Sequence, residues 1–198
     1  MCAALTSAAD AWTSADADWE ALQTAAAEAF SANDLTGAAA SWGAALRIAR
    51  ASFEADDPRL ATSLANHAVA LRQKGEPVPA RLWQEALEIW DEAAAWLLRQ
   101  RFAPRARSSI FHLRLEARNP GAYDDNLRRQ ATSLLYEARA ATAALAAGAC
   151  GQAPDPTAFQ AFRSARFDAL RKVLAAVHLL LAPAPPQDAR PQPAQDGS

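Results

Sequence analysis

The motif Trp-x-x-Ala-Leu-x-Ile occurs twice in this chain, and the two copies are 41 residues apart. The first copy begins at Trp42 and the second at Trp83. A fixed period of roughly 20–50 residues is typical of arrays in which one supersecondary unit stacks on the next. Such an array presents an extended surface rather than a deep pocket. The repeat therefore favours a binding protein over an enzyme.

The composition favours helices throughout the chain. Hydrophobic residues make up 51% of the 198 residues, and many of them are alanine, the best helix former. Alternation of aromatic and β-branched residues with a period of two, which would indicate strands, is missing. We therefore predict an all-α fold.

Charge is distributed unevenly along the chain. The net charge is −2, but residues 1–98 carry 14 acidic and 6 basic side chains, whereas residues 99–139 carry 4 acidic and 9 basic ones. This asymmetry suits contact between copies of the chain or contact with an acidic partner. It is not the strongly basic balance of a nucleic-acid-binding domain, so we expect no nucleic acid among the partners.

The cysteines and the apolar runs argue against several other classes of protein. Cys2 and Cys150 lie far from each other and from any histidine cluster, which argues against a disulfide framework or a zinc site. No apolar run approaches the roughly 18 residues of a membrane span, and residues 1–18 lack the features of a signal peptide. We expect a cytoplasmic protein that needs no cofactor, no metal and no membrane.

Turn and capping residues divide the chain into seven expected helices. Asn33 and Asp34 predict a turn followed by an N-cap, Asp57 and Pro58 predict a helix start, and Gly75 predicts a helix end. The approximate ranges are 14–30, 34–54, 58–74, 80–101, 105–118, 123–147 and 156–181. The last range carries a long apolar stripe, and the proline-rich residues after it are expected to be disordered.

The paired helices resemble the tetratricopeptide repeat, with an alanine and a large aromatic residue in the second helix and a glycine between the helices. Residues 57–96 are especially similar to the kinesin light chain type, whose repeats are about 42 residues long. The resemblance is looser over 19–54, weak over 105–148, and absent in the last helix. The first unit has Asn33 near the place of the glycine, the loop at 76–79 is one residue short, and the third unit lacks the tryptophan motif.

The resemblance implies a right-handed α-α superhelix (a solenoid) of about three helical hairpins, whose first helices line a concave groove for peptides or proteins. The hairpins would cover about 15–54, 57–101 and 105–148, and the helix at 157–182 would cap the array. The repeat domain would thus span 15–182. Residues 1–14 would form an N-terminal segment and 183–198 a disordered tail.

Six residues are candidates for contact with a partner. By resemblance, Asn66 falls where many such repeats place a groove asparagine that bonds a ligand's main chain, and a local bond within the helical hairpin is the alternative. Arg107 lies 41 residues later and shares a helix face with Arg114, so both could bind carboxylates of an acidic peptide. Solvated charge or ion pairs to the acidic half are the alternative for these arginines. The full set is Asn66, Arg105, Arg107, Ser108, Phe111 and Arg114.

The tryptophans are expected in the hydrophobic core, and one histidine is expected where two helices pack closely. Trp42 and Trp83 should fill the core between paired helices. Trp90 and Trp96 could either pack in the core, which we favour, or form an exposed patch for a partner. His67 is expected at a position of tight helix packing.

No phosphate-binding loop, metal-ligand cluster or catalytic motif stands out in the sequence. We therefore expect a non-catalytic adaptor that holds a protein or peptide, for example as an assembly factor or accessory subunit. One alternative is a structural subunit that assembles into homo-oligomers. Another is a regulatory domain that binds a small molecule, which a deep apolar pocket with a perturbed ionisable group would indicate.

Overall fold

The computed structural model describes residues 13–100 and 122–148, and all regular structure in these two ranges is helical. The helices are α1 (Ser14–Ser31), α2 (Leu35–Ser52), α3 (Pro58–Gln73), α4 (Ala80–Arg99) and α6 (Ala122–Ala146). The prediction of an all-α fold is confirmed for this part of the chain, and the helix ends lie within about two residues of their expected positions. The expected helices at 105–118 and 156–181 lie outside the described residues.

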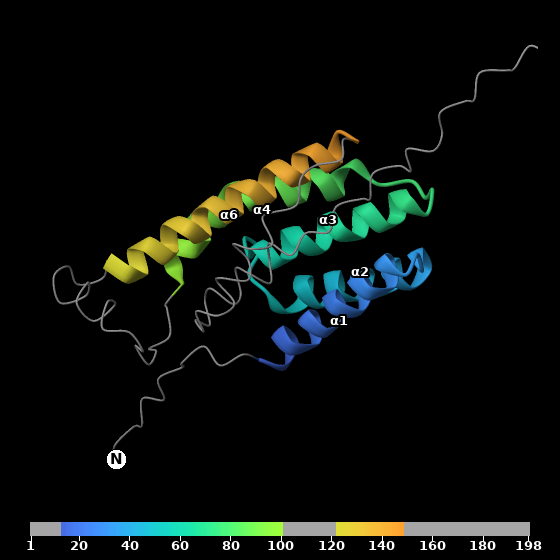
Figure 1. The fold of residues 1–198 in the computed structure, drawn as a ribbon, viewed down its shortest axis with the longest axis horizontal. Coiled ribbons are helices and arrows are strands. Elements are labelled where there is room, and N and C mark those ends of the chain that lie inside the picture. Colours follow the sequence, from blue (N-terminus) through green and yellow to red (C-terminus); the bar gives the residue numbers. More distant parts are fainter. Residues whose placement is uncertain (1–12, 101–121, 149–198) are drawn as a thin grey trace, which may run out of the picture.

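Each helix packs against the next one along the chain from α1 to α4, and α6 packs against α4. Figure 1 shows the described helices side by side in a row, from α1 at the lower edge to α4 and α6 at the upper edge. One cluster of buried side chains includes residues from all five of these helices, among them Trp19, Leu46, Leu64, Ile89 and Leu135. The core therefore runs along the row.

The turns after α1 and after α3 have the same backbone structure. After α1, the amide of Asp34 donates to the carbonyl of Ala29 over 2.8 Å, and the equivalent bond after α3 measures 2.9 Å. Such a bond across five residues is typical of the Schellman motif, which contains a residue with left-handed backbone angles. Asn33 (φ 61°) and Gly75 (φ 75°) are those residues. Asparagine tolerates this conformation better than most residues, so the first unit makes the turn without a glycine.

The second helices of the two hairpins begin differently. Asp34 directly precedes α2, and its side chain accepts a hydrogen bond of 2.9 Å from the amide of Gly37. By contrast, α4 begins only at Ala80, after a segment that contains Pro77 and Pro79, and its N-cap makes no side-chain hydrogen bond. The tryptophan motif keeps its 41-residue spacing because this segment replaces the first turn of the second helix.

Trp42 and Trp83 both pack in the core, as expected. The Trp42 side chain is fully buried, and its ring centroid lies 5.4 Å from that of Phe30 on α1. Trp83 is 9% exposed, and the guanidinium of Arg72 at the end of α3 lies 5.5 Å from its ring centroid. Each indole therefore contacts the end of the first helix in its own hairpin.

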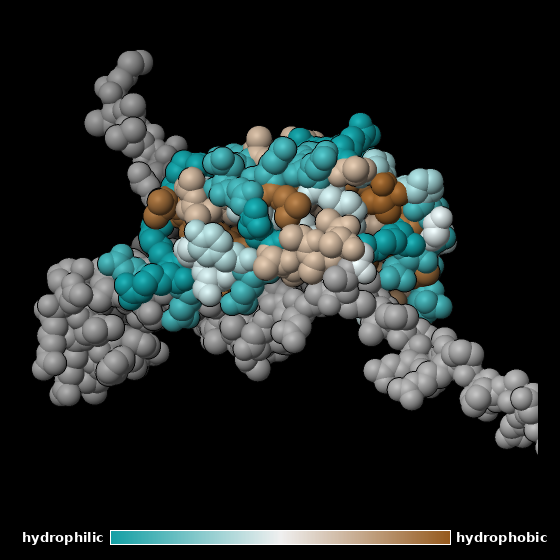
Figure 2. Space-filling view, turned by 90° about the horizontal axis from the view of Figure 1, so that it is seen from above, coloured by the Kyte–Doolittle hydropathy of each residue, from teal (hydrophilic) through white to brown (hydrophobic). Residues whose placement is uncertain are grey.

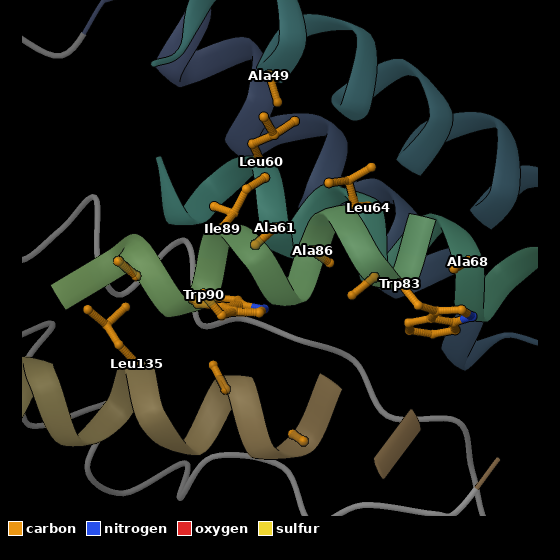
Figure 3. Close-up of a cluster of buried hydrophobic side chains, with 14 of the residues drawn as sticks. Ala49, Leu60, Ala61, Leu64, Ala68, Trp83, Ala86, Ile89, Trp90 and Leu135 are labelled. Atoms are coloured by element: carbon orange, nitrogen blue, oxygen red, sulfur yellow. The ribbon is translucent and has the colours of Figure 1, made fainter. Parts of the chain in front are cut away.

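Trp90 and Trp96 are also core residues, with exposures of 2% and 1%. Figure 3 shows Trp90 on the side of α4 that faces α6, where Leu135 points back toward α4. The prediction of core packing is confirmed for both indoles, and the alternative of an exposed tryptophan patch is wrong.

The surface of the described residues shows little exposed apolar area. Figure 2 shows a face on which hydrophilic residues predominate and hydrophobic ones are scattered among them. Leu98 and Tyr136 are the large hydrophobic residues exposed in the described ranges. Single residues of this kind are common on protein surfaces. No helix in the part of the chain that the structure covers is long and apolar enough to cross a membrane.

Among the described helices α3 is the most enclosed, because twelve of its sixteen residues are buried. Figure 3 shows Ala61 and Leu64 of α3 close to Ala86 and Ile89 of α4. Small side chains at such positions let two helices approach closely. The buried set also includes four polar residues: Arg59, Thr62, Ser63 and Asn66.

The two left-handed residues give a test of the shared turn. We expect Gly75→Ala and Asn33→Ala each to lower the free energy of unfolding by about 1–2 kcal/mol, because alanine is strained at positive φ. A Cβ at residue 75 would meet no described atom within 4 Å, so steric contact would not add to the loss. Urea unfolding followed by circular dichroism measures the change.

Asn33→Gly is the matched control. Since glycine adopts the left-handed conformation readily, we expect this variant to stay within about 0.5 kcal/mol of the wild type. Equal losses in Asn33→Gly and Asn33→Ala would show that the backbone conformation is not the cause.

Candidate functional site

The structure describes one of the six residues that the sequence suggests for contact with a partner. That residue is Asn66 on α3. The other five lie outside the described residues, and their role stays a prediction: Arg105, Arg107, Ser108, Phe111 and Arg114.

Asn66 is buried between neighbouring hairpins. Its side chain is fully buried, and its Nδ2 donates to Oε1 of Gln23 over 3.2 Å. Gln23 belongs to α1, so this bond joins the first helices of two hairpins, whereas the sequence suggested either a ligand or a bond within one hairpin. A ligand could reach the amide only after it was uncovered. Contact between Asn66 and a ligand stays a prediction.

Ser63 lies at the centre of the polar contact between α1 and α3. Its Oγ accepts hydrogen bonds from Nε1 of Trp19 over 2.8 Å and from Nε2 of Gln23 over 3.3 Å. The same hydroxyl donates to the backbone carbonyl of Arg59 over 2.8 Å. A hydroxyl has one proton and two lone pairs, so Ser63 uses its full capacity. This agrees with the general rule that buried polar groups are hydrogen-bonded.

Arg59 forms a buried ionic cluster at the beginning of α3. Its side chain is 4% exposed, its Nε donates to Oδ1 of Asp57 over 3.0 Å, and its Nη2 donates to Oδ2 of Asp57 over 2.6 Å. Its Nη1 donates to Asp16 on α1. The guanidinium carbon also lies 3.5 Å from the ring centroid of Phe53, in the α2–α3 connection. The guanidinium fork suits this geometry because it can bond two carboxylates in one plane.

The ionic cluster shifts the pKa values of Asp16 and Arg59. Burial alone would raise the pKa of Asp16, but hydrogen bonds with Arg59 and Thr13 outweigh burial and hold the pKa below its usual 3.8. Burial alone would lower the pKa of Arg59, but Asp57 and Asp16 raise it above its ordinary value. Both groups therefore stay ionised near neutral pH, and the cluster holds α1 and α3 together by charge as well as by hydrogen bonds.

The bonds between α1 and α3 connect residues at a nearly constant sequence separation. Trp19 and Ser63 are 44 residues apart, Asp16 and Arg59 are 43 apart, and Gln23 is 43 from Asn66. These separations are close to the 41 residues between the tryptophan motifs. The polar contact therefore fixes the register of one hairpin on the next. The sequence analysis missed it, although polar pairs near the repeat period were the signal that could have revealed it.

Two arginines fix α6 in the row. Arg128, near the start of α6, donates to the carbonyls of Leu97 over 2.8 Å and Gln100 over 3.0 Å at the end of α4. Arg72, at the end of α3, donates to the carbonyl of Leu145 at the end of α6. Basic groups hydrogen-bond the last carbonyls of a helix and interact favourably with the negative end of its dipole. The helix α6 thus runs antiparallel to α4 and in the same direction as α3.

Part of the basic segment, residues 99–139, pairs with the acidic half of the chain, residues 1–98. Arg139 on α6 donates from Nη2 to Oδ2 of Asp91 over 3.2 Å, and Arg99 bonds Asp56 and lies 3.5 Å from Glu54. The bond from Arg139 lowers the pKa of Asp91 below its usual value. Exposed pairs of this kind contribute only about 0–1 kcal/mol to stability, but they leave less positive charge for an outside partner.

Among the residues that the structure covers, no group of three or more His, Cys, Asp or Glu could hold a metal ion. No family model, curated protein or solved structure matches the chain. The resemblance to tetratricopeptide repeats therefore stays a prediction from the sequence.

Removing Arg59 should be far more harmful than removing an exposed arginine. We expect Arg59→Met to destabilise the protein by about 3–5 kcal/mol, because it leaves the carboxylates of Asp16 and Asp57 buried without their cation. Urea unfolding at pH 7 measures the loss.

Arg50→Met is the matched control, since Arg50 pairs with Glu85 over 2.7 Å and its side chain is 48% exposed. We expect this variant to lose about 0–1 kcal/mol. Similar losses in the two variants would contradict the structural importance of the buried cluster.

Proposed function

We propose that this chain is a non-catalytic protein-interaction module of tetratricopeptide type, whose hairpins stack into a right-handed superhelix. The observation that carries the proposal is the set of bonds between α1 and α3, which join residues 40–44 apart. A register close to the sequence period is what stacking of one unit on the next requires. The shared Schellman turn supports the same equivalence of the two hairpins.

The position of α6 supports a continuing array. The helix α3 packs on α2, runs in the same direction as α1, and contacts α1 through side chains. In the same way α6 packs on α4, runs in the same direction as α3, and contacts α3 near its end. In this arrangement α6 takes the place of a first helix, whereas the sequence made it the second helix of the hairpin at 105–148. An array of this kind presents a long face formed by successive first helices, and such faces bind extended peptides or other proteins.

The proposed partner is a protein or peptide with acidic groups. Arg99, Arg128 and Arg139 of the basic segment already bond other residues of the chain. The positive charge offered to a partner would therefore come mainly from the segment that contains Arg107 and Arg114. Their guanidinium groups would bind side-chain carboxylates or a C-terminal carboxylate in bidentate fashion.

The test compares charge reversals at two places. We expect Arg107→Glu with Arg114→Glu to reduce recovery of a specific partner from the native lysate at least about tenfold, since four units of charge change at the proposed site. The affinity of the purified partner for each variant is then measured by isothermal titration calorimetry. Binding that weakens as salt rises would agree with charge-assisted recognition.

Arg81→Glu with Arg129→Glu is the matched control, because both arginines are exposed on α4 and α6 and the change in charge is the same. We expect this variant to bind like the wild type. Equal affinity of the Arg107/Arg114 variant and the wild type would contradict the proposed binding face. Sedimentation of the chain alone at low and high salt checks self-association, which would appear as an oligomer that dissociates in salt.

A further inference from the structure

His67 lies in the contact between α2 and α3, where the two helices approach closely. It is half-buried on α3 and donates a hydrogen bond to the backbone carbonyl of Ala39 on α2. One turn further along α2 is Gly43, and a Cβ there would lie 3.3 Å from Cε1 of His67. The imidazole therefore occupies the space that the missing side chain of Gly43 leaves. This position agrees with the tight packing expected for His67.

The second nitrogen of this imidazole, Nδ1, has no described acceptor nearby for a proton that it would carry. Nδ1 is buried and has no hydrogen-bond partner among the described residues. It lies 3.6 Å from the point where a Cβ on Gly43 would stand, and Nη1 of Arg47 lies 3.9 Å from the same point. A proton on Nδ1 would thus create a buried donor without an acceptor, beside a guanidinium. Such a donor is costly because its hydration is lost without replacement.

The charged groups around His67 come from two elements. Arg47 and Arg50 of α2 oppose a positive charge on the ring, and Glu76, just after α3, favours it. Burial is the largest effect and lowers the pKa of His67 below its usual 6.5, while the bond to Ala39 and the charge of Glu76 act in the opposite direction. The neutral imidazole is therefore the form that fits between α2 and α3.

We propose that His67 makes the contact between α2 and α3 a proton-sensitive joint, which loosens when the imidazole is protonated in mildly acidic solution. The ionic cluster of Asp16, Arg59 and Asp57 lies at the other end of α1 and α3 from their shared turns. Asp16 stays ionised in this pH range because its pKa lies below 3.8. Acid therefore loosens α2 from α3 while the bonds between α1 and α3 persist. The angle between the first and second hairpins becomes dependent on pH.

The sign of the effect follows from proton linkage. Well above pH 6.5 the imidazole is neutral in both the closed and the opened state, so pH has little influence there. Below this pH the opened state binds a proton that the closed state rejects, so opening becomes more favourable. The equilibrium constant for opening rises by at most about tenfold per pH unit, until the pH reaches the lowered pKa of the closed state.

Hydrogen exchange of the full chain, followed by mass spectrometry, tests the joint. We expect opening of α2 to increase between pH 7.5 and pH 5.5, by at most about tenfold, after correction for the intrinsic exchange rate. Amides of α4 act as the internal reference and should change less, because the groups that act on His67 belong to α2 and to the turn after α3. A change of equal size in α2 and α4 would mean global unfolding and would overturn the proposal.

His67→Gln is the main variant, because glutamine can still donate to Ala39 but does not titrate. We expect it to remove the acid-induced opening of α2, and an unchanged pH response would overturn the proposal. Any contribution from His112 or His178 persists in this variant and is thereby subtracted. If His67→Gln does not fold, Arg47→Gln and an NMR titration of His67 in the wild type decide the matter. A midpoint below 6.5 that rises in Arg47→Gln supports the joint, and a midpoint at or above 6.5 overturns it.

Discussion

Because α3 is buried along most of its length, its polar side chains depend on hydrogen-bond partners inside the protein, and most of them have one, although Oγ1 of Thr62 has none among the described residues. An ion such as the Arg59 guanidinium cannot be left alone there, since burying an unpaired charge is far costlier than burying a paired one. Asp57 next to it and Asp16 on α1 are the partners that the structure gives it. The position of α1 is thus tied to α3 by groups that cannot be satisfied in another register.

This constraint determines which contacts can vary. The buried residues of α2 are mostly alanine, with Trp42 and Leu46, so its contact with the rest of the row depends mainly on close packing, to which the exposed Arg50–Glu85 pair adds little. The contact between α1 and α3 is polar and specific, and the ends of α4 and α6 are fixed by arginines that bond the last carbonyls. Apolar packing gives the array its stability, and the polar bonds give it a single register. Both are needed for a surface whose shape a partner could recognise.

The helices could be predicted well from the sequence, because the capping and turn residues that begin and end a helix act locally. Asp57 with Pro58 and the turn at Asn33 act through their own backbone, so their effect can be read from a few neighbouring residues. The burial of Trp42 and Trp83 followed from the repeat. The bonds of Ser63, Arg59 and Asn66 were not predictable in the same way, because each depends on a residue 40–44 positions away. The sequence suggested two roles for Asn66, contact with a ligand or a bond within its own hairpin. Neither included the bond to the neighbouring hairpin that the structure shows.

The burial of Asn66 changes what binding along the first helices would involve. In an open groove a partner's main chain replaces water around such an amide at little cost. Here the amide already bonds Gln23 within the core, so a partner that used it would have to replace this bond and reopen the contact between α1 and α3. That contact also contains the Arg59 cluster, whose disruption is expensive. We therefore propose contact with a partner at Arg107 and Arg114 rather than at Asn66.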